Sequence, residues 1–164
     1  MFLYPNAYLD SVLDIDEKFL KKNNIKGLLL DVDNTLIDFD KKLSKEIIAW
    51  SDRTKALGIK MCILSNTNKY EKVKTVSEKL DIEFIYFAKK PSKKGFLKGR
   101  DKLGLDVKNI AIVGDQIFTD IIGGNRVGMF GILVKPIDDR DIFITKIKRP
   151  IEQWIINKYN KGRK

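Results

Sequence analysis

The feature that most constrains the fold is a series of short apolar runs separated by segments with helical spacing. Five of these runs favour strands: residues 25–30, 60–64, 84–86, 110–113 and 131–134. Uninterrupted apolar runs of this length are typical of strands buried on both faces of a parallel sheet. Because strand and helix alternate, the sequence predicts an α/β fold with a doubly wound, Rossmann-like parallel sheet.

Local residues indicate where some of the helices begin and end. Ser44 is a good N-cap for a helix that ends near Gly58, and Gly104 is expected to close a later helix. Gly123 and Gly124 fall between the last two predicted strands, where each glycine costs roughly 1 kcal/mol relative to alanine inside a helix. Close packing of the backbone against the site would explain this pair.

Length and composition indicate one domain. The 164 residues are 43% hydrophobic and 33% charged, which suits a single domain with one substantial core. We expect this domain to occupy residues 1–164, with its core at about 25–135 and a basic extension at about 140–164. No apolar run approaches the roughly 20 residues that span a bilayer, and the N-terminus lacks the pattern of a signal peptide. These features predict a cytoplasmic protein.

The absence of histidine removes several kinds of chemistry. The chain has no histidine and one cysteine, Cys62, in the apolar run MCIL. Ser-His-Asp triads, phosphohistidine enzymes and histidine-ligated zinc sites are therefore excluded. A cysteine-dependent phosphatase is excluded too, because the residues that follow Cys62, ILSNTNKY, contain no arginine to hold phosphate. We expect Cys62 to be a small buried hydrophobic residue.

Positive charge is concentrated in two segments. Of the net charge of +10, residues 89–102 carry +6 and residues 140–164 carry another +6, which leaves −2 for the rest of the chain. Such clusters suit an anionic partner, namely a phosphate ester, a lipid head group or nucleic acid. A solvated basic surface without a partner is the alternative interpretation.

Four aspartates stand where apolar runs stop. Asp31 and Asp33 follow the run LLL, and Asp115 and Asp120 follow the run IAIVG. Because ligands collect at the carboxyl ends of the strands in an open α/β sheet, we expect at least three of these side chains to converge on one site. Crowded carboxylates repel one another unless a cation lies among them, and Mg2+ is a hard ion that prefers oxygen ligands. The pattern therefore predicts a metal-assisted reaction.

The segment Asp31-Val-Asp33-Asn-Thr35 resembles the first motif of the haloacid dehalogenase-like (HAD) phosphohydrolases. Three later segments resemble the other motifs of that superfamily, in the same order: ILSNT with Ser65, AKKP with Lys90, and GDQIFTD. The resemblance spans the predicted core. The segments DNTL, SNT, KKP and GDQIFTDIIGGN are most similar to the YqeG-type members of subfamily IIIA, which includes phosphatidylglycerophosphate phosphatases.

The resemblance implies a role in phosphoryl transfer for each of these residues. Asp31 would be the nucleophile that forms an aspartyl-phosphate, and Asp33 would serve first as general acid and then as general base. Ser65, Asn66 and Lys90 would bind the phosphoryl oxygens and stabilise the charge that develops on them. The substrate would be a phosphomonoester.

The same resemblance implies a magnesium site. Asp31, the main-chain carbonyl of Asp33 and Asp115 would hold Mg2+, with water molecules completing the octahedron. Two further residues are expected to support the site rather than to react, namely Thr35 and Asp120. Asp120 would orient the phosphate-binding lysine instead of binding the ion.

The spacing of the motifs leaves no room for a cap domain over the site. Many HAD phosphatases carry such a domain, but residues 36–64 and 66–89 each accommodate only one helix and part of a strand. An open site suits a phosphomonoester on a large molecule, because the partner itself must then exclude water. The expected substrate is therefore bulky, with a lipid such as phosphatidylglycerophosphate preferred on the resemblance.

The stretch that begins at Pro150 predicts an amphipathic helix. Ile151, Trp154, Ile155 and Tyr159 recur at helical spacing and are expected to share one face. The basic residues around them are Arg149, Lys158, Lys161, Arg163 and Lys164. One interpretation is an ordinary packed terminal helix, and the other is peripheral contact with an anionic membrane.

Other classes of function remain as alternatives. A basic protein could bind nucleic acid, although the sequence shows no aromatic-interleaved RNA motif and no zinc-ligand spacing, which argues against that class. A response-regulator receiver also uses acidic residues and a lysine, but its phosphorylated aspartate comes from a middle strand, whereas Asp31 ends the first predicted strand. Within the phosphatases, a nucleotide, sugar or protein phosphate is the alternative substrate. The sequence leaves the oligomeric state open.

Overall fold

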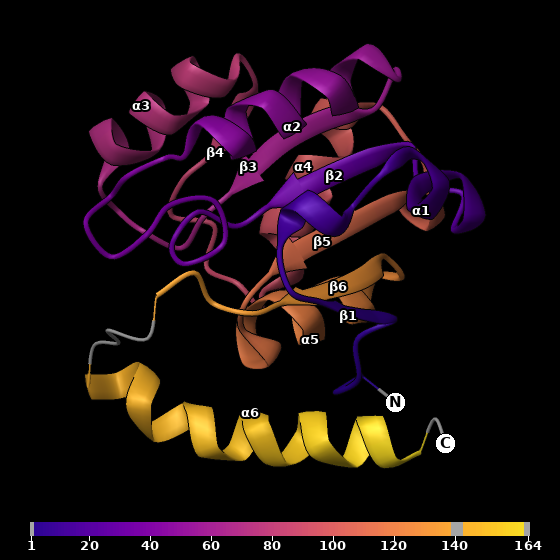
Figure 1. Ribbon diagram of the computed structural model, residues 1–164, viewed down its shortest axis with the longest axis vertical. Coiled ribbons are helices and arrows are strands. Elements are labelled where there is room, and N and C mark those ends of the chain that lie inside the picture. Colours follow the sequence, from indigo (N-terminus) through magenta and orange to yellow (C-terminus); the bar gives the residue numbers. More distant parts are fainter. Residues whose placement is uncertain (1, 139–142, 163–164) are drawn as a thin grey trace.

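A computed structural model describes residues 2–138 and 143–162 of the chain. At its centre is a six-stranded sheet in the order β1-β6-β5-β2-β3-β4, in which each pair of neighbouring strands is parallel (Figure 1). The strands are β1 (Ala7–Leu9), β2 (Gly27–Leu30), β3 (Lys60–Leu64), β4 (Glu83–Ile85), β5 (Ile110–Gly114) and β6 (Phe130–Val134).

Helices cover both faces of this sheet. They are α1 (Glu17–Lys22), α2 (Lys45–Ala56), α3 (Tyr70–Leu80), α4 (Lys93–Leu103), α5 (Ile122–Val127) and α6 (Phe143–Lys161). The other described elements are two 3-10 turns, η1 (Val12–Asp14) and η2 (Val107–Asn109), and a π-helix, η3 (Ile117–Ile121). In Figure 1, α2 and α3 lie on one face and α4 and α5 on the other, while α6 runs along the side of β1 and β6. The predicted doubly wound parallel sheet is confirmed.

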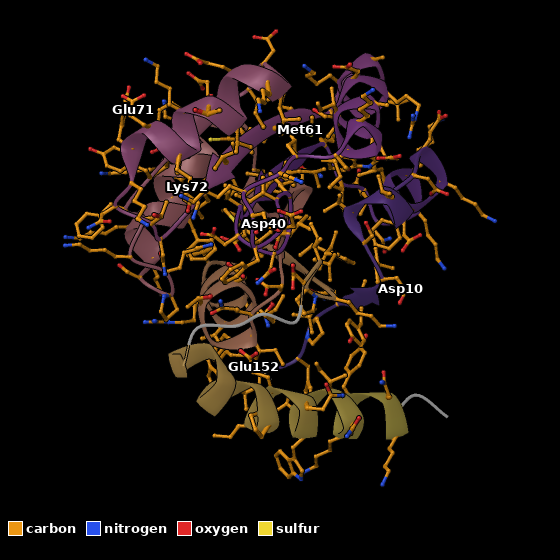
Figure 2. The ribbon with its side chains drawn as sticks, turned by 60° about the vertical axis from the view of Figure 1, so that its left-hand side comes forward. Asp10, Asp40, Met61, Glu71, Lys72 and Glu152 are labelled. Atoms are coloured by element: carbon orange, nitrogen blue, oxygen red, sulfur yellow. The ribbon has the colours of Figure 1, made fainter. Side chains whose placement is uncertain are left out.

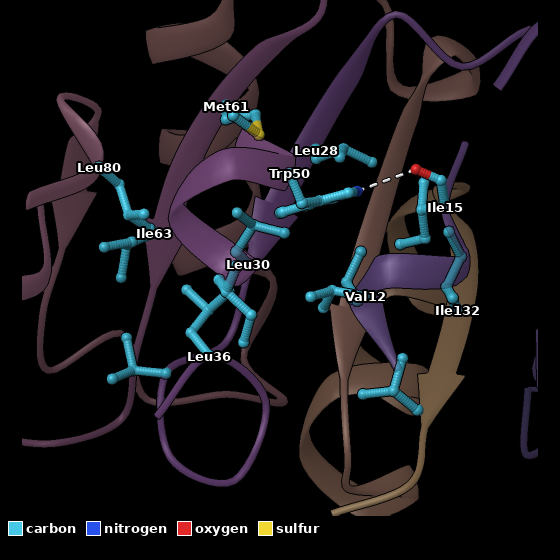
Figure 3. Close-up of a cluster of buried hydrophobic side chains, with 14 of the residues drawn as sticks. Val12, Ile15, Leu28, Leu30, Leu36, Trp50, Met61, Ile63, Leu80 and Ile132 are labelled. Atoms are coloured by element: carbon cyan, nitrogen blue, oxygen red, sulfur yellow. Dashed lines mark hydrogen bonds between the residues drawn. The ribbon is translucent and has the colours of Figure 1, made fainter. Parts of the chain in front are cut away.

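The two faces of β2 enter separate hydrophobic cores. Leu28 and Leu30 belong to a core that includes Trp50 of α2, whose indole Nε1 donates a hydrogen bond to the carbonyl of Ile15 at 2.9 Å (Figure 3). Leu29 belongs to the core on the opposite face, beneath α4. Because successive side chains of a strand point to opposite sides, a strand covered on both faces is apolar throughout.

Most element boundaries agree with the sequence. The five predicted strands correspond to β2 through β6 within two residues, and the Oγ of Ser44 caps α2 by accepting a hydrogen bond from the amide of Ile47 at 3.2 Å. Gly104 ends α4 with a φ of +64°, as its type suggests. Cys62 is buried as predicted, and burial raises the pKa of its thiol to about 12. The sequence did not predict β1 or α1.

The C-terminal helix α6 is longer than predicted and has a different inner face. It begins at Phe143 rather than at Pro150, so Pro150 lies inside the helix instead of in its first turn. Ile155 is buried, whereas Ile151 and Trp154 are 53% and 62% exposed. The prediction that these apolar residues share one face was therefore wrong.

The inner face of α6 includes Glu152, a charged residue that a sequence pattern assigns to water. It is 4% exposed and lies on the side of the helix that faces the rest of the molecule (Figure 2). Within the described residues, no helix is both long enough and apolar enough to cross a bilayer. Arg163 and Lys164, which the prediction of a basic helix included, lie outside the described residues, as does the side chain of Arg149.

Candidate active site

The site lies where the strand order changes direction. β2 and β5 are neighbours, and the chain proceeds from β2 toward β3 on one side and from β5 toward β6 on the other. Asp31 follows β2 and Asp115 follows β5, and the amide of Asp31 donates to the carbonyl of Val113 at 2.9 Å. In open α/β sheets, ligands bind outside the carboxyl ends of the strands at such a switch point.

Three buried carboxylates converge there. Asp31, Asp115 and Asp120 each offer an oxygen atom, and these atoms all lie within 4.8 Å of one another. The ammonium group of Lys90 lies 2.7 Å from Oδ1 of Asp31 and 2.6 Å from Oδ1 of Asp120. The predicted convergence of at least three acidic side chains is confirmed, with Asp120 as the third member.

The side chain of Asp33 lies apart from this cluster. It is 50% exposed and forms an ion pair with Lys72, which α3 contributes. After Asp31 the chain enters a tight turn. In this turn Asn34 has a φ of +60°, and its amide donates to the carbonyl of Ile37 at 2.9 Å. The turn carries Asp33 to the rim of the site, while Asp31 remains in its buried centre.

Thr35 and Ser65 are both buried. The hydroxyl of Thr35 donates to Oδ2 of Asp31 at 3.5 Å, which is the supporting contact that its position in the first motif suggests. Ser65 follows β3, and its Oγ accepts a hydrogen bond from the amide of Thr67 at 3.3 Å. The amide of Ser65 donates to the carbonyl of Ile85 at 2.9 Å, which fixes the end of β3 against β4.

Asn66 binds the backbone on both sides of the lysine that it was expected to assist. Its Oδ1 accepts from the amide of Lys90 at 2.6 Å, and its Nδ2 donates to the carbonyl of Lys90 at 3.0 Å. Both polar ends of the Asn66 side chain are therefore engaged with the chain itself. The contact holds Lys90 in register with the end of β3, and the phosphate-binding role of Asn66 stays a prediction.

Asp120 is placed by the π-helix η3. Its amide donates to the carbonyl of Gln116 at 3.0 Å, and its Oδ2 accepts from the amide of Gln116 at 3.2 Å. A Cβ at Gly114 would lie 2.1 Å from Oδ2 of Asp120, so only glycine fits at the end of β5. Sequence reasoning missed both features, although the glycine directly before Asp115 was a visible indication of a close approach.

Burial and charge act in opposite directions on the two central groups. Burial raises the pKa of Asp31 to about 7, with the ammonium of Lys90 opposing this shift and the carboxylate of Asp120 reinforcing it. For Lys90 the balance is reversed, since two carboxylates in direct contact outweigh the effect of burial and hold the pKa of its ammonium above the ordinary range. Lys90 is therefore charged, and its one charge is shared between two acids.

The donor set fits a hard divalent cation. All three side chains of the cluster offer carboxylate oxygens, which are the ligands that Mg2+ prefers, whereas nitrogen and sulfur ligands suit zinc. Lys90 already contacts Asp31 and Asp120.

A pocket of about 510 Å3 opens beside Asp115. It lies between the end of β6 and α6, and its wall includes Tyr8, Lys135 and Glu152. The pocket gives the carboxylate cluster a neighbouring space that is larger than a phosphate group. Part of its wall comes from α6, which is the element that sequence reasoning placed least well.

Comparison with known proteins reveals clear relatives. The family model described as mitochondrial PGP phosphatase matches residues 1–137. The chain is 38% identical over 157 residues to the probable phosphatase YqeG of Bacillus subtilis, a match that covers 95% of this chain and 91% of the relative. It is 28% identical to phosphatidylglycerophosphate phosphatase 1, chloroplastic/mitochondrial, of Arabidopsis thaliana, over 96% of this chain and 48% of that protein.

Solved structures share the fold at lower identity. An uncharacterized protein from Listeria monocytogenes serotype 4b superposes with a TM-score of 0.57 at 24% identity, over 72% of this chain and 85% of that one. A HAD phosphatase from Thermococcus onnurineus gives a TM-score of 0.53 at 22% identity, over 67% and 58% of the two chains. These likenesses show that the sheet and its helices have the HAD arrangement.

Proposed function

The chain belongs to the mitochondrial PGP phosphatase family and is a phosphatase with the HAD fold, and from this premise we propose that it hydrolyses a phosphomonoester through an aspartyl-phosphate on Asp31. The observation that carries the proposal is the buried position of Asp31, within 4.8 Å of two other carboxylates and 2.7 Å from a charged lysine. A nucleophilic carboxylate of this kind divides phosphoryl transfer into two easier steps.

Asp33 would transfer a proton in both steps of the proposed reaction. In the first step an oxygen of Asp31 attacks phosphorus, the ester bond breaks, and Asp33 donates its proton to the departing alcohol oxygen. In the second step Asp33 removes a proton from water, which attacks phosphorus and releases inorganic phosphate and the free Asp31 carboxylate. The half-exposed position of Asp33 at the rim suits a group that exchanges protons with solvent. Its ion pair with Lys72 must open for this role.

Ser65 and Lys90 would contact the phosphoryl oxygens. Fixed donors that meet charge as it develops are the main source of catalysis in phosphoryl transfer. Lys90 is suited to this role because it is buried, charged and held in place by Asp31, Asp120 and Asn66. The buried Ser65 hydroxyl stands at the end of the neighbouring strand β3.

Mg2+ is the proposed cofactor. Asp31, the main-chain carbonyl of Asp33 and Asp115 would hold it, and Asp120 would remain bound to Lys90. When bound, the ion would neutralise negative charge on the phosphoryl oxygens and between the carboxylates. A deoxy-D-mannose-octulosonate 8-phosphate phosphatase from Haemophilus influenzae that shares the fold, with a TM-score of 0.51 at 19% identity, was solved with cobalt bound.

A bulky lipid phosphomonoester such as phosphatidylglycerophosphate is the preferred substrate. Relatives from Arabidopsis thaliana and Saccharomyces cerevisiae that are named as phosphatases of this lipid support this preference. The connections between the motifs consist of α2 with β3 and of α3 with β4, so the described chain has no separate cap over the cluster. A nucleotide, sugar or protein phosphate is the alternative substrate class.

We also propose that α6 makes peripheral contact with an anionic membrane. Ile151 and Trp154 are exposed on its outer side, and the ammonium of Lys158 lies 5.1 Å from the centre of the Trp154 ring. Aromatic and aliphatic side chains beside lysines suit the interface of an anionic bilayer. A cytoplasmic location, a single domain over residues 1–164 and the absence of nucleic acid binding stay predictions.

The test is phosphate release by the purified protein with Mg2+. The substrates would be phosphatidylglycerophosphate in micelles, a nucleoside monophosphate, a sugar phosphate and a phosphoserine peptide. Asp31→Asn should lower kcat by about 10³-fold or more, because no other group can form the covalent intermediate. Asp52→Asn, which changes an exposed acid of α2, is the matched control and should keep full activity. Undiminished release by Asp31→Asn would contradict the mechanism, and no release from any substrate would contradict the proposed function.

A further inference from the structure

The π-helix η3 begins without a cap from its own segment. The first amides of a helix have no acceptor within the helix, and Gln116 at the N-cap position makes no side-chain capping hydrogen bond. The acceptor comes from α6 instead. Oε1 of Glu152 lies 3.0 Å from the amide nitrogen of Ile117 and 3.3 Å from that of Phe118. A carboxylate 35 residues away therefore takes the place of the N-cap side chain.

Apolar packing fixes Glu152 in this position. Ile155 and Ile156, which follow it on α6, share a buried cluster with Ile117 and Ile121 of η3. A carboxylate in such surroundings is costly unless it accepts hydrogen bonds, and the amides of Ile117 and Phe118 supply them. Apolar contacts and these hydrogen bonds thus both join α6 to η3, and the two contributions can be tested separately.

The capped element carries a residue of the active site. Asp120 belongs to η3, and its Oδ1 lies 2.6 Å from the ammonium of Lys90. Its other oxygen and its amide both bond to Gln116, the residue directly before the two capped amides. A shift at the start of η3 would therefore move the carboxylate that contacts Lys90. Hydrogen bonds connect Gln116 to Asp120, and an ion pair connects Asp120 to Lys90.

We propose that Glu152 is a positioning residue for the phosphatase reaction, acting through η3 and Asp120 on Lys90. The inference rests on the proposed function, since it concerns the same lysine. It extends beyond the family resemblance, because the matching family model ends at residue 137 and α6 begins at Phe143. The C-terminal helix is then a part of the catalytic apparatus as well as a surface element.

Steady-state kinetics of three variants tests whether Glu152 affects turnover. Glu152→Ala should lower kcat about tenfold with KM changed less than twofold, because small displacements of catalytic groups reduce turnover at this scale. Glu152→Gln retains an oxygen acceptor for the two amides and should stay within about threefold of the wild-type kcat. Ile155→Ala is the matched control, since it loosens the packing of α6 and leaves the capping carboxylate in place. Equal losses of kcat in Glu152→Ala and Ile155→Ala would overturn the proposal.

Hydrogen exchange gives a readout that does not depend on activity. In Glu152→Ala, the amides of Ile117 and Phe118 should exchange at least about tenfold faster than in Ile155→Ala, measured at a temperature where both variants are folded. If wild-type protein releases no phosphate, the proposed function fails, and accelerated exchange would still support the capping role. If wild-type protein is active and exchange at these two amides is unchanged in Glu152→Ala, the inference about Glu152 is wrong.

Discussion

The four central side chains carry more negative than positive charge. Asp31, Asp115 and Asp120 are acids, and Lys90 is the cation in contact with two of them, so these four groups carry a net charge of −2 when all are ionised. Buried charges without compensation are strongly unfavourable. A divalent cation would neutralise the excess, and a proton on Asp31 would neutralise part of it. The raised pKa of Asp31 means that this proton is held more tightly than in a solvated aspartate.

Replacing Asp31 with asparagine should stabilise the metal-free protein more at pH 8 than at pH 5. Burial raises the pKa of Asp31 from 3.8 to about 7, so between these values the folded state holds a proton that the unfolded state releases. The stabilising effect of this proton is present at low pH and is lost as pH rises through 7. An asparagine at this position does not titrate and has no such loss, and Lys90 stays charged throughout this range. The advantage of the variant in free energy of unfolding should therefore grow by roughly 2 kcal/mol between the two pH values.

Urea unfolding in the presence of EDTA measures this quantity. Asp52→Asn, which removes an exposed carboxylate, serves as the control and should show no such trend. An advantage of Asp31→Asn that is constant or that shrinks as pH rises would show that Asp31 ionises normally in the folded protein.

The sequence located some site residues well and others not at all. Asp31 and Asp115 were predictable, because each ends an apolar run and the carboxyl ends of parallel strands meet at one edge. Asn66 could be placed near the site, but its double contact with the backbone of Lys90 depends on how two loops meet. Nothing in the sequence indicated that Glu152 is buried, since a glutamate in an amphipathic helix is usually solvated.

At the scale of elements, two glycines set how closely α5 packs. A Cβ at Gly124 would lie 2.3 Å from the side chain of Ile112 in β5, and one at Gly123 would lie 2.2 Å from the ring of Phe96 in α4. The sequence indicated that close packing was the reason for this pair. It placed that packing against the site, and a Cβ at Gly123 would indeed lie 3.2 Å from the Cα of Pro91, the residue after Lys90. The tightest contacts, however, are with a helix and a strand of the hydrophobic core beneath α4.

Gly123→Ala should destabilise the protein by about 1–3 kcal/mol. Alanine favours a helix over glycine by roughly 1 kcal/mol, but overpacking against the fully buried ring of Phe96 costs more than this gain. The midpoint of urea unfolding measures the change. Gly162→Ala is the matched control and should lie within about 0.5 kcal/mol of wild type, since its Cβ would meet nothing closer than 3.7 Å. Recovery of stability in the double variant Gly123→Ala/Phe96→Leu would locate the clash, and an unchanged midpoint for Gly123→Ala would refute it.

The elements that the sequence did not reveal are short or interrupted. β1 has three residues, too few for an alternating or continuous apolar run to be recognised, and its position in the sheet comes from pairing with β6. The start of α6 was misplaced because Pro150 resembles a first-turn residue, although the helix begins at Phe143. The long apolar runs of β2, β3 and β5 were predicted because burial on both faces leaves a continuous pattern.

For the whole molecule, the arrangement of the exposed apolar residues bears on the partner. Several large apolar side chains stay exposed after the carboxyl ends of strands, namely Phe39, Tyr70, Tyr86, Phe87 and Ile137. Trp154 and Ile151 add two more on the outer side of α6. Exposed apolar residues that form a contiguous patch are typical of surfaces that meet another apolar phase or a protein. The proposed membrane contact predicts that some of these residues, together with the net charge of +10, adjoin an anionic surface.

Trp154→Ser should weaken binding to vesicles rich in anionic phospholipid by about tenfold. Transfer of an exposed tryptophan side chain into the interface contributes on the order of 1.5–3 kcal/mol, and about 1.4 kcal/mol corresponds to a factor of ten. Leu57→Ser is the matched control, because Leu57 is 44% exposed at the end of α2, remote from α6, and its loss should leave binding unchanged. Sedimentation with vesicles at low and high salt separates the apolar contribution to binding from the electrostatic one. High salt screens the attraction between the lysines and the anionic lipid, but it does not weaken the apolar contribution. Equal binding by the two variants would exclude the outer side of α6 as the membrane contact, and equal binding to zwitterionic vesicles would exclude a role for the positive charge.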